Sequence, residues 1–150
     1  MSAFKQKLLA SCKAVIDKKI KALNDALTEV TDAGNNETKS TAGDKHETGR
    51  AMMQLEQEKL GNQIIEWEKQ QTILNKITFN NSSNTISLGS FIETNHGNFF
   101  IAGNIGKVNV EDKEVMVISM QSPLGICLMK HKACDEFEFN GVNYRLNRSE

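Results

Sequence analysis

Apolar residues recur every three or four positions along the first half of the chain, which is the spacing of one face of a helix. The first such run extends from Phe4 to about Asp32 and contains neither proline nor glycine. Its apolar members are Phe4, Leu8, Cys12, Val15, Ile16, Ile20, Leu23, Leu27 and Val30. The pattern predicts a helix of about 30 residues, roughly 45 Å long.

A second helical run extends from about Asp44 to Ile77. Four of its apolar residues are seven positions apart, with Ile64 between them: Met53, Leu60, Trp67 and Leu74. This repeat is typical of a heptad seam between two helices. Met52 also lies in the apolar run, and we expect it to pack in the same seam.

The segment between the two runs, "AGNNETKSTAG", is rich in glycine and asparagine, which favour turns. Two long helices with matching apolar stripes and one connecting loop predict an antiparallel coiled-coil hairpin over residues 1–77. The tip of this hairpin is expected at about residues 33–48.

The pattern changes after residue 77. Residues 78–87 are dominated by asparagine and serine and are interpreted as a linker. Short β-type segments follow in residues 88–150: "SFIETN", "GNFFIAG", "KVNV", "EVMVIS" and "FEFNGVNYRL". Turns are expected at Asn95–Asn98 and at Asn140-Gly141, and Pro123 can open one short helix. The predicted class is α+β, a helical hairpin followed by a small β-rich domain.

The distribution of charged residues along the chain is more informative than the net charge. The 150 residues carry a formal net charge of −1, which excludes an indiscriminate nucleic-acid binder. Residues 1–24 hold six lysines against Asp17, whereas residues 25–48 hold six acids against Lys39 and Lys45. The lysines form either a solvated face or a binding surface.

The apolar runs and the cysteines bear on localisation. No apolar run reaches the roughly 18–20 residues that a membrane helix needs, and the N-terminal residues have no signal-peptide pattern. Three cysteines without a CxxC motif favour a reduced, cytoplasmic protein.

Asp44 and Glu47, in "GDKHETGR", are the first candidates for chemistry. Asp-x-x-Glu before an apolar-periodic segment is typical of a capping box, which contributes about 1 kcal/mol. Two carboxylates three residues apart also point the same way at a helix start. Mg²⁺ binds through one or two carboxylates while keeping water ligands. The pair is a poor complete site, but it is suited to completing a metal site that a partner supplies.

Cys127, His131 and Cys134 follow one another at i, i+4 and i+7. On a helix these residues would share a face and suggest zinc, but no fourth ligand is in view and cysteine is an ordinary core residue. We therefore favour the structural interpretation. The aromatic residues of 88–150 fall mostly at strand positions suited to a core, which disfavours a prolyl isomerase pocket.

The order of these parts resembles the bacterial Gre transcript-cleavage factors. The family's tip reads Gly-Asp-Leu-Ser/Lys-Glu-Asn-Ala-Glu-Tyr, against Gly-Asp-Lys-His-Glu-Thr-Gly-Arg-Ala in residues 43–51 here. The family's "SPIARALIGKKEGDVVEV…YEI" is similar to "SPLGICLMKHKACDEFEFNGVNYRL" here. The corresponding positions are Ser122, Pro123, Leu128, Lys130, Asp135 and Tyr144.

This resemblance implies a specific function. Gre factors are not enzymes themselves; they bind RNA polymerase and insert the hairpin into its secondary channel. By residue match, Asp44 and Glu47 would help hold the second Mg²⁺ and the attacking water that hydrolyses backtracked RNA. The resemblance further implies that residues 88–150 form an FKBP-like domain that docks at the channel rim. Ser122, Pro123 and Lys130 are the candidate partner-binding residues.

The same resemblance sets expectations about cofactors and partners. The chain would have no cofactor of its own, would meet RNA only through the polymerase, and would bind neither membranes nor specific DNA sequences.

The chain also departs from the family pattern. Thr48-Gly49-Arg50-Ala51 replaces the family's Asn-Ala-Glu-Tyr, and Cys134 stands where the family has glycine before Asp135. Two alternatives therefore stay open. One is a secondary-channel regulator without cleavage activity, and the other is a coiled-coil adaptor or chaperone unrelated to transcription.

Overall fold

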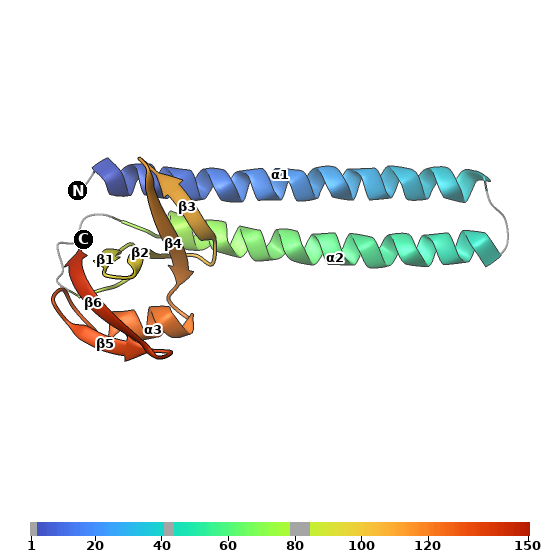
Figure 1. Cartoon of the computed structure of the whole chain (residues 1–150). Helices are drawn as coiled ribbons and strands as arrows, with labels where there is room; N and C mark the ends of the chain where they lie inside the picture. Colours follow the sequence, from blue (N-terminus) through green and yellow to red (C-terminus); the bar gives the residue numbers. More distant parts are fainter. Residues whose placement is uncertain (1–2, 41–43, 79–84) are drawn as a thin grey trace. The chain divides into compact units, whose positions relative to one another are not determined.

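The structure is a computed structural model that describes residues 3–40, 44–78 and 85–150 (Figure 1). The side chains of residues 36–40 and 44–46 are also outside the description. Most of the predicted linker and the centre of the predicted tip therefore lie outside the described residues. Packing divides the chain into two units, Ile16–Lys69 and Met1–Val15 with Gln70–Glu150.

The predicted α+β class is confirmed. Two long helices precede a six-stranded mixed sheet and one short helix. The elements are α1 (Ala3–Ser40), α2 (Asp44–Asn75), β1 (Phe91–Thr94), β2 (Gly97–Ala102), β3 (Gly106–Val110), β4 (Lys113–Ser119), α3 (Pro123–Met129), β5 (Glu136–Phe139) and β6 (Val142–Ser149). The helix that Pro123 was predicted to open begins at that residue.

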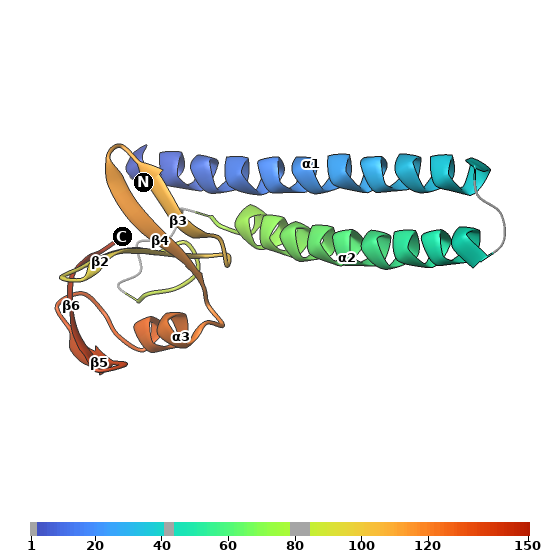
Figure 2. The same ribbon diagram turned by 45° about the vertical axis from the view of Figure 1, so that its right-hand side comes forward.

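The unit Ile16–Lys69 consists of the facing parts of α1 and α2, which run antiparallel (Figures 1 and 2). Ile16 on α1 and Leu60 and Ile64 on α2 are buried. Gln57 Nε2 donates a hydrogen bond of 2.9 Å to Thr31 Oγ1 across the pair. Two helices bury only one stripe each, so most other positions of this unit are exposed.

The expected end of the first helix near Asp32 was wrong, because α1 continues through Gly34, Asn35 and Asn36 to Ser40. Gly34 is buried against α2. A Cβ atom at Gly34 would overlap Met53 Sδ and lie 2.8 Å from Met53 Cγ. Contact between the helices therefore outweighs the weak helix propensity of this segment, which the sequence pattern assigned to a turn.

The strands of the second unit lie in the order β3-β4-β2-β1-β6-β5. Neighbouring strands are antiparallel except β2 and β4, which pair in parallel. The hairpin predicted at Asn95–Asn98 joins β1 to β2, and the one predicted at Asn140-Gly141 joins β5 to β6. Asn140 and Gly141 both have positive φ, as a two-residue hairpin turn of this type requires.

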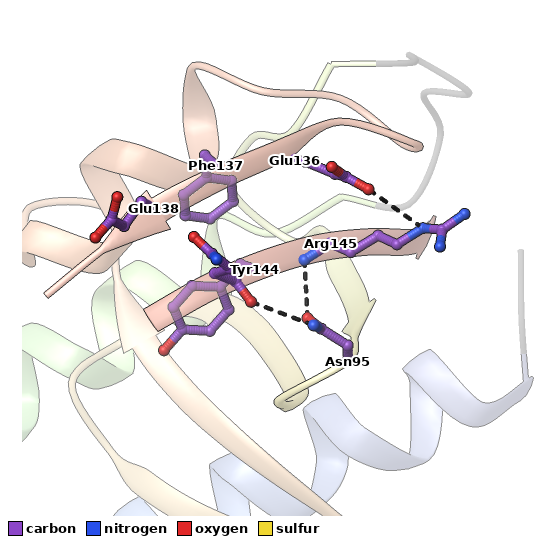
Figure 3. Close-up of a pocket in the computed structure, with 7 residues that line it drawn as sticks. Asn95, Glu136, Phe137, Glu138, Tyr144 and Arg145 are labelled. Atoms are coloured by element: carbon purple, nitrogen blue, oxygen red, sulfur yellow. Dashed lines mark hydrogen bonds and ion pairs between the residues drawn. The ribbon is translucent and has the colours of Figure 1, made fainter. Parts of the chain in front are cut away.

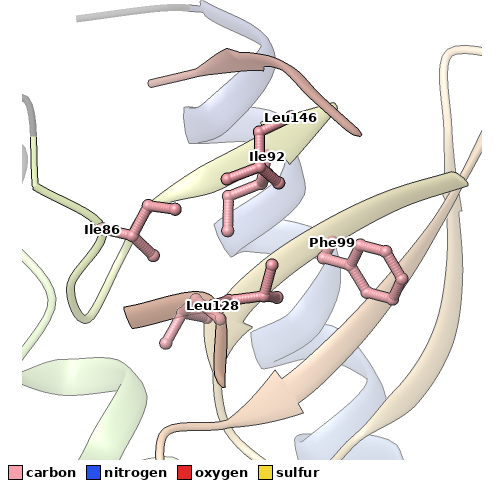
Figure 4. Close-up of a cluster of buried hydrophobic side chains, with 6 residues drawn as sticks. Ile86, Ile92, Phe99, Leu128 and Leu146 are labelled. Atoms are coloured by element: carbon pink, nitrogen blue, oxygen red, sulfur yellow. The ribbon is translucent and has the colours of Figure 1, made fainter. Parts of the chain in front are cut away.

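The central strands are buried on both faces, because successive side chains point to opposite sides of a sheet. On one face Phe91 meets Phe4 of α1, with ring centroids 5.0 Å apart. On the other face a cluster of apolar side chains forms a core with α3 (Figure 4). Its members are Ile86, Ile92, Phe99, Ile101, Leu128 and Leu146.

Polar contacts also hold the ends of the two long helices against the sheet within this unit. Lys5 Nζ donates to the backbone oxygen of Glu150 at 3.0 Å, and Lys7 forms an ion pair with Glu111. Gln70 Oε1 of α2 accepts from the backbone N–H of Asn104 at 2.7 Å. Partial burial lowers the pKa of Lys5, and the charge of Glu150 opposes that shift. At least two of the N-terminal lysines therefore contact the chain itself.

No helix among the described residues is long and apolar enough to cross a membrane.

The contact between Gly34 and Met53 predicts a non-additive pair of substitutions. Gly34→Ala adds a methyl group that overlaps Met53 and should destabilise the chain by about 1–2 kcal/mol. In a Met53→Ala background the same substitution should stabilise it by about 1 kcal/mol, because only the helix propensity of alanine remains. Denaturant unfolding followed by circular dichroism at 222 nm measures the coupling.

Gly61→Ala is the matched control, because Gly61 also lies in a helix but has nothing within 4 Å of an added Cβ atom. It should stabilise the chain by about 1 kcal/mol in both backgrounds. Additive effects of Gly34→Ala and Met53→Ala would show that the two helices do not meet at these residues.

Candidate functional site

The acidic pair lies in the first turn of α2. Asp44 is the first residue of the helix and Glu47 the fourth, and the Glu47 side chain is exposed. The capping contact predicted for Asp44 depends on its side chain, which is outside the description. The first backbone N–H groups of a helix have no partner within it, and together they place partial positive charge at its start. The fold therefore puts both acids where a helix favours negative charge.

The residues that follow the acids expose apolar surface. Met52 was predicted to pack in the seam, and this prediction was wrong, because its side chain is 66% exposed. Adjacent residues on a helix differ by about 100° in direction, so Met52 points outward where Met53 faces Gly34. Leu55 is 67% exposed. A hollow of about 250 Å³ lies here between the helices, lined by Val30, Ala33, Gly34, Gly49, Met52, Met53 and Glu56.

Ser122 and Pro123 form the start of α3. Ser122 Oγ accepts from the backbone N–H of Gly125 at 3.0 Å and donates to the backbone oxygen of Ser119 at 2.7 Å. Ser122 is therefore a helix cap whose hydroxyl already has two partners within the chain. A side chain at Gly125 would overlap the Ser119 oxygen, so the turn needs glycine there. Pro123 and Lys130 have exposed side chains at either end of α3.

The segment after α3 forms a tight turn that leads into β5. Asp135 N–H donates to Lys132 O at 3.1 Å, and Cys134 has a φ of 75°. Positive φ at the third residue of such a turn is typical of type II and normally requires glycine. Cys134 N–H donates to Leu146 O at 2.8 Å, while Leu146 N–H donates to Asp135 O at 2.9 Å. Cys134 and Asp135 thus lie opposite the single residue Leu146. This arrangement is a β-bulge of the type whose first residue is normally a glycine in the left-handed conformation.

The three residues considered for zinc do not share a helix face. The helix α3 ends at Met129, and His131 and Cys134 come after it. His131 Nδ1 lies 2.8 Å from Cys127 O, and its ring stacks on Phe137 with centroids 4.5 Å apart. Burial raises the pKa of the remaining thiol, Cys12, to about 12, so it stays protonated and unreactive. No group of three or more His, Cys, Asp or Glu suited to a metal occurs in the described part of the chain.

A row of rings crosses the β5–β6 hairpin. Phe137 stacks on Tyr144 with centroids 5.3 Å apart, and His96 meets Tyr144 edge-on at 5.4 Å. Phe91, Phe99 and Phe100 are buried in the core, as the strand pattern predicted. These rings pack on one another and on the core.

Beside this row lies a hollow of about 410 Å³ that sequence reasoning missed (Figure 3). It is lined by Asn95, Glu136, Phe137, Glu138, Asn143, Tyr144 and Arg145. The Asn95 side chain accepts from Arg145 N–H at 2.8 Å and donates to Asn143 O at 3.2 Å. The alternation of Glu and Phe in β5 was visible in the sequence, but the pairing of Asn95 with β6 had no local signal.

The candidate places for interaction are thus the start of α2, the exposed ends of α3, and the β5–β6 hairpin. Comparison of the chain with protein-family models, with curated proteins and with solved structures finds no match.

The left-handed conformation of Cys134 predicts a stabilising substitution. Cys134→Gly should raise the free energy of unfolding by about 1 kcal/mol, because an L-residue pays roughly that for this conformation and glycine does not. The Cys134 side chain is exposed, so little packing is lost. Thermal unfolding measures the change. The neighbouring Ala133→Gly is the control and should give no gain, since Ala133 has negative φ. A loss of stability in Cys134→Gly would contradict the turn described above.

Proposed function

We propose that this chain is a Gre-type factor that binds RNA polymerase and stimulates the cleavage of backtracked RNA. The observation that carries the proposal is the position of Asp44 and Glu47. They begin α2, directly after the connection from α1, and Glu47 is exposed. At 1.5 Å per residue the 32 residues of α2 extend about 48 Å. An acidic pair on long antiparallel helices suits delivery of carboxylates into a deep channel of a partner.

The chemistry of the acids fits an accessory role and not an enzyme active site. One or two carboxylates are a common protein contribution to Mg²⁺, with water and substrate oxygens completing the shell. The second ion of a two-metal site stabilises the attacking and leaving oxygens of a phosphodiester. Asp44 and Glu47 would hold that ion from the side of the factor, and the polymerase would supply the remaining ligands. The partial positive charge at the start of α2 makes this position favourable for negatively charged groups in general.

The turn between α3 and β5 supports the same proposal. The resembled family has glycine where this chain has Cys134, and Cys134 adopts the left-handed conformation that favours glycine. The family's Ser-Pro corresponds to Ser122 as helix cap and Pro123 as first helical residue. Two features of the family's sequence, the glycine and the Ser-Pro pair, thus fall at positions where the backbone of this chain favours those residue types. We extend the proposal to an FKBP-like identity for the β-rich part, and to docking at the channel rim through exposed Pro123 and Lys130.

A regulator that binds the same channel without cleavage is the second candidate. The observation in its favour is the replacement of the family's Asn-Ala-Glu-Tyr by Thr48-Gly49-Arg50-Ala51 directly after the acids. Arg50 brings a positive charge to the position of a family acid. The test below separates binding from cleavage for this reason.

The test uses a backtracked elongation complex assembled with RNA polymerase from the same source. The intact chain should bind it and shorten the RNA at its 3′ end. Asp44→Asn with Glu47→Gln keeps side-chain size and hydrogen-bonding oxygens but removes both charges. This double variant should bind equally and lose about 100-fold in cleavage rate. Glu58→Gln, at an exposed position of the same helix, is the control and should cleave normally.

Each other result has a defined meaning. Binding without any shortening by the intact chain would exclude cleavage and favour the regulator. Normal cleavage by the double variant would restrict the acids to helix capping. If the polymerase is not bound at all, the proposal fails, and the adaptor or chaperone alternative becomes the better one.

A further inference from the structure

The strand β5 forms one edge of the sheet. In the order β3-β4-β2-β1-β6-β5 it has β6 as its only strand neighbour among the described residues. The pairing sets Glu136 opposite Arg145, Phe137 opposite Tyr144, and Phe139 opposite Val142. The other side of β5 therefore carries backbone groups that no described strand pairs.

The alternation of hydrogen bonds between β5 and β6 shows which residues of β5 carry the unpaired backbone groups. In an antiparallel pair, directly opposed residues alternate between exchanging hydrogen bonds and not exchanging them. Leu146 N–H donates to the oxygen of Asp135, its opposite residue, at 2.9 Å. The next bonding residues of β5 are consequently Phe137 and Phe139. The N–H and C=O groups of Glu136 and Glu138 point away from β6, toward the open edge.

The side chains along this edge alternate between charged and aromatic. Glu136 and Glu138 lie on one face and are exposed, whereas Phe137 and Phe139 lie on the other and are half-buried. Arg145 forms an ion pair with Glu136, with its Nε 3.8 Å from Glu136 Oε1 (Figure 3). Both partners of that pair are exposed, so it contributes little and can be replaced. Glu138 has no ion-pair partner among the described residues.

The strand is also held firmly enough to act as a template. The turn at 132–135 and its bulge fix where β5 begins. Phe137 is packed between the rings of His131 and Tyr144. The hollow of about 410 Å³ beside the hairpin leaves room for an incoming side chain.

A second copy of β5 is a poor occupant of this edge. Antiparallel pairing of two such edges has to use Glu136 and Glu138 of both copies as the bonding residues. Most of these registers place glutamate opposite glutamate, and like charges directly opposed destabilise a sheet. Short, charged edge strands are a usual defence against such self-pairing. The negative charges of Glu136 and Glu138 instead favour pairing with a segment that carries lysine or arginine.

We propose that β5 binds an extended segment of a partner protein by strand addition. The segment would run antiparallel to β5, with Lys or Arg opposite Glu136 and Glu138 and an apolar residue between them on the side of Phe137. Backbone hydrogen bonds to Glu136 and Glu138 supply affinity, and the cross-strand ion pairs supply selectivity. This surface shares no residue with the acids of α2, so the inference goes beyond the proposed function and does not depend on it.

The probe is an acetylated and amidated eight-residue peptide of alternating lysine and valine, added to the full chain labelled with ¹⁵N. We expect saturable binding, with the largest shift changes at the amides of Glu136 and Glu138 and slower hydrogen exchange at both. The charge-reversed variant Glu136→Lys with Glu138→Lys should bind at least about 10-fold more weakly. A peptide of alternating glutamate and valine should not bind.

Two controls separate strand addition from simple charge attraction. Glu29→Lys with Glu58→Lys changes the net charge equally at exposed positions of the long helices, and it should keep the affinity. A lysine–valine peptide with alternate amides N-methylated cannot donate to the edge and should lose binding. The ¹⁵N spectra of both variants report whether the sheet is intact.

Several results would overturn the proposal. They are equal binding of the N-methylated peptide, shift changes that avoid β5, and equal weakening by the helix control variant. Self-association of the peptide-free chain through β5, seen by sedimentation and abolished by the Glu136 and Glu138 substitutions, would assign the edge to a second copy instead.

Discussion

The close contact of α1 with α2 is the constraint on which the helical unit depends. A pair of helices has one seam in which to bury apolar side chains, so each helix can use only one stripe. Ile16, Leu60 and Ile64 fill that stripe, and Gly34 lets α2 approach at Met53. Everything outside the stripe is left to solvent or to a partner. The exposure of Glu47, Met52 and Leu55 follows from this geometry and not from any local preference of those residues.

The second unit is under a different constraint, because both faces of its sheet have to be covered by short segments of chain. The root of α1 covers one face through Phe4, and α3 covers the other through Leu128. The short path from α3 to β5 requires a tight turn and a bulge, which Cys134 accommodates in a conformation unusual for it. The same turn determines which residues of β5 form hydrogen bonds with β6. The backbone N–H and C=O groups of Glu136 and Glu138 therefore point toward the open edge. A local backbone requirement thereby determines which residues a partner can meet.

Periodicity predicted the two helices, because apolar positions repeated at helical spacing over many turns. Turn chemistry predicted the start of α3 at Pro123 and the hairpin at Asn140-Gly141, since those residues favour one backbone conformation. The end of α1 was not predictable, because it depends on Gly34 meeting a residue of the other helix. The outward direction of Met52 was missed for a related reason, as two adjacent apolar residues cannot both face one seam.

The candidate sites also differ in whether the sequence alone could predict them. Asp44 and Glu47 were identifiable from spacing and from a resemblance, since the role proposed for them depends on position along one helix. The edge at β5 was not identifiable, because it depends on the order of all six strands in the sheet, which pairs β6 with the distant strand β1. Such contacts join residues far apart in the chain and leave no local signal.

The central claim is that the first turns of α2 enter the polymerase beside its catalytic Mg²⁺. The most direct measurement replaces the exposed Ala51 with the photo-reactive residue p-benzoylphenylalanine and maps the cross-links formed in a complex with RNA polymerase. We expect attachment to the polymerase segments that surround the catalytic ion. Attachment only to the outer surface of the polymerase, in a complex shown to have formed, would contradict the claim.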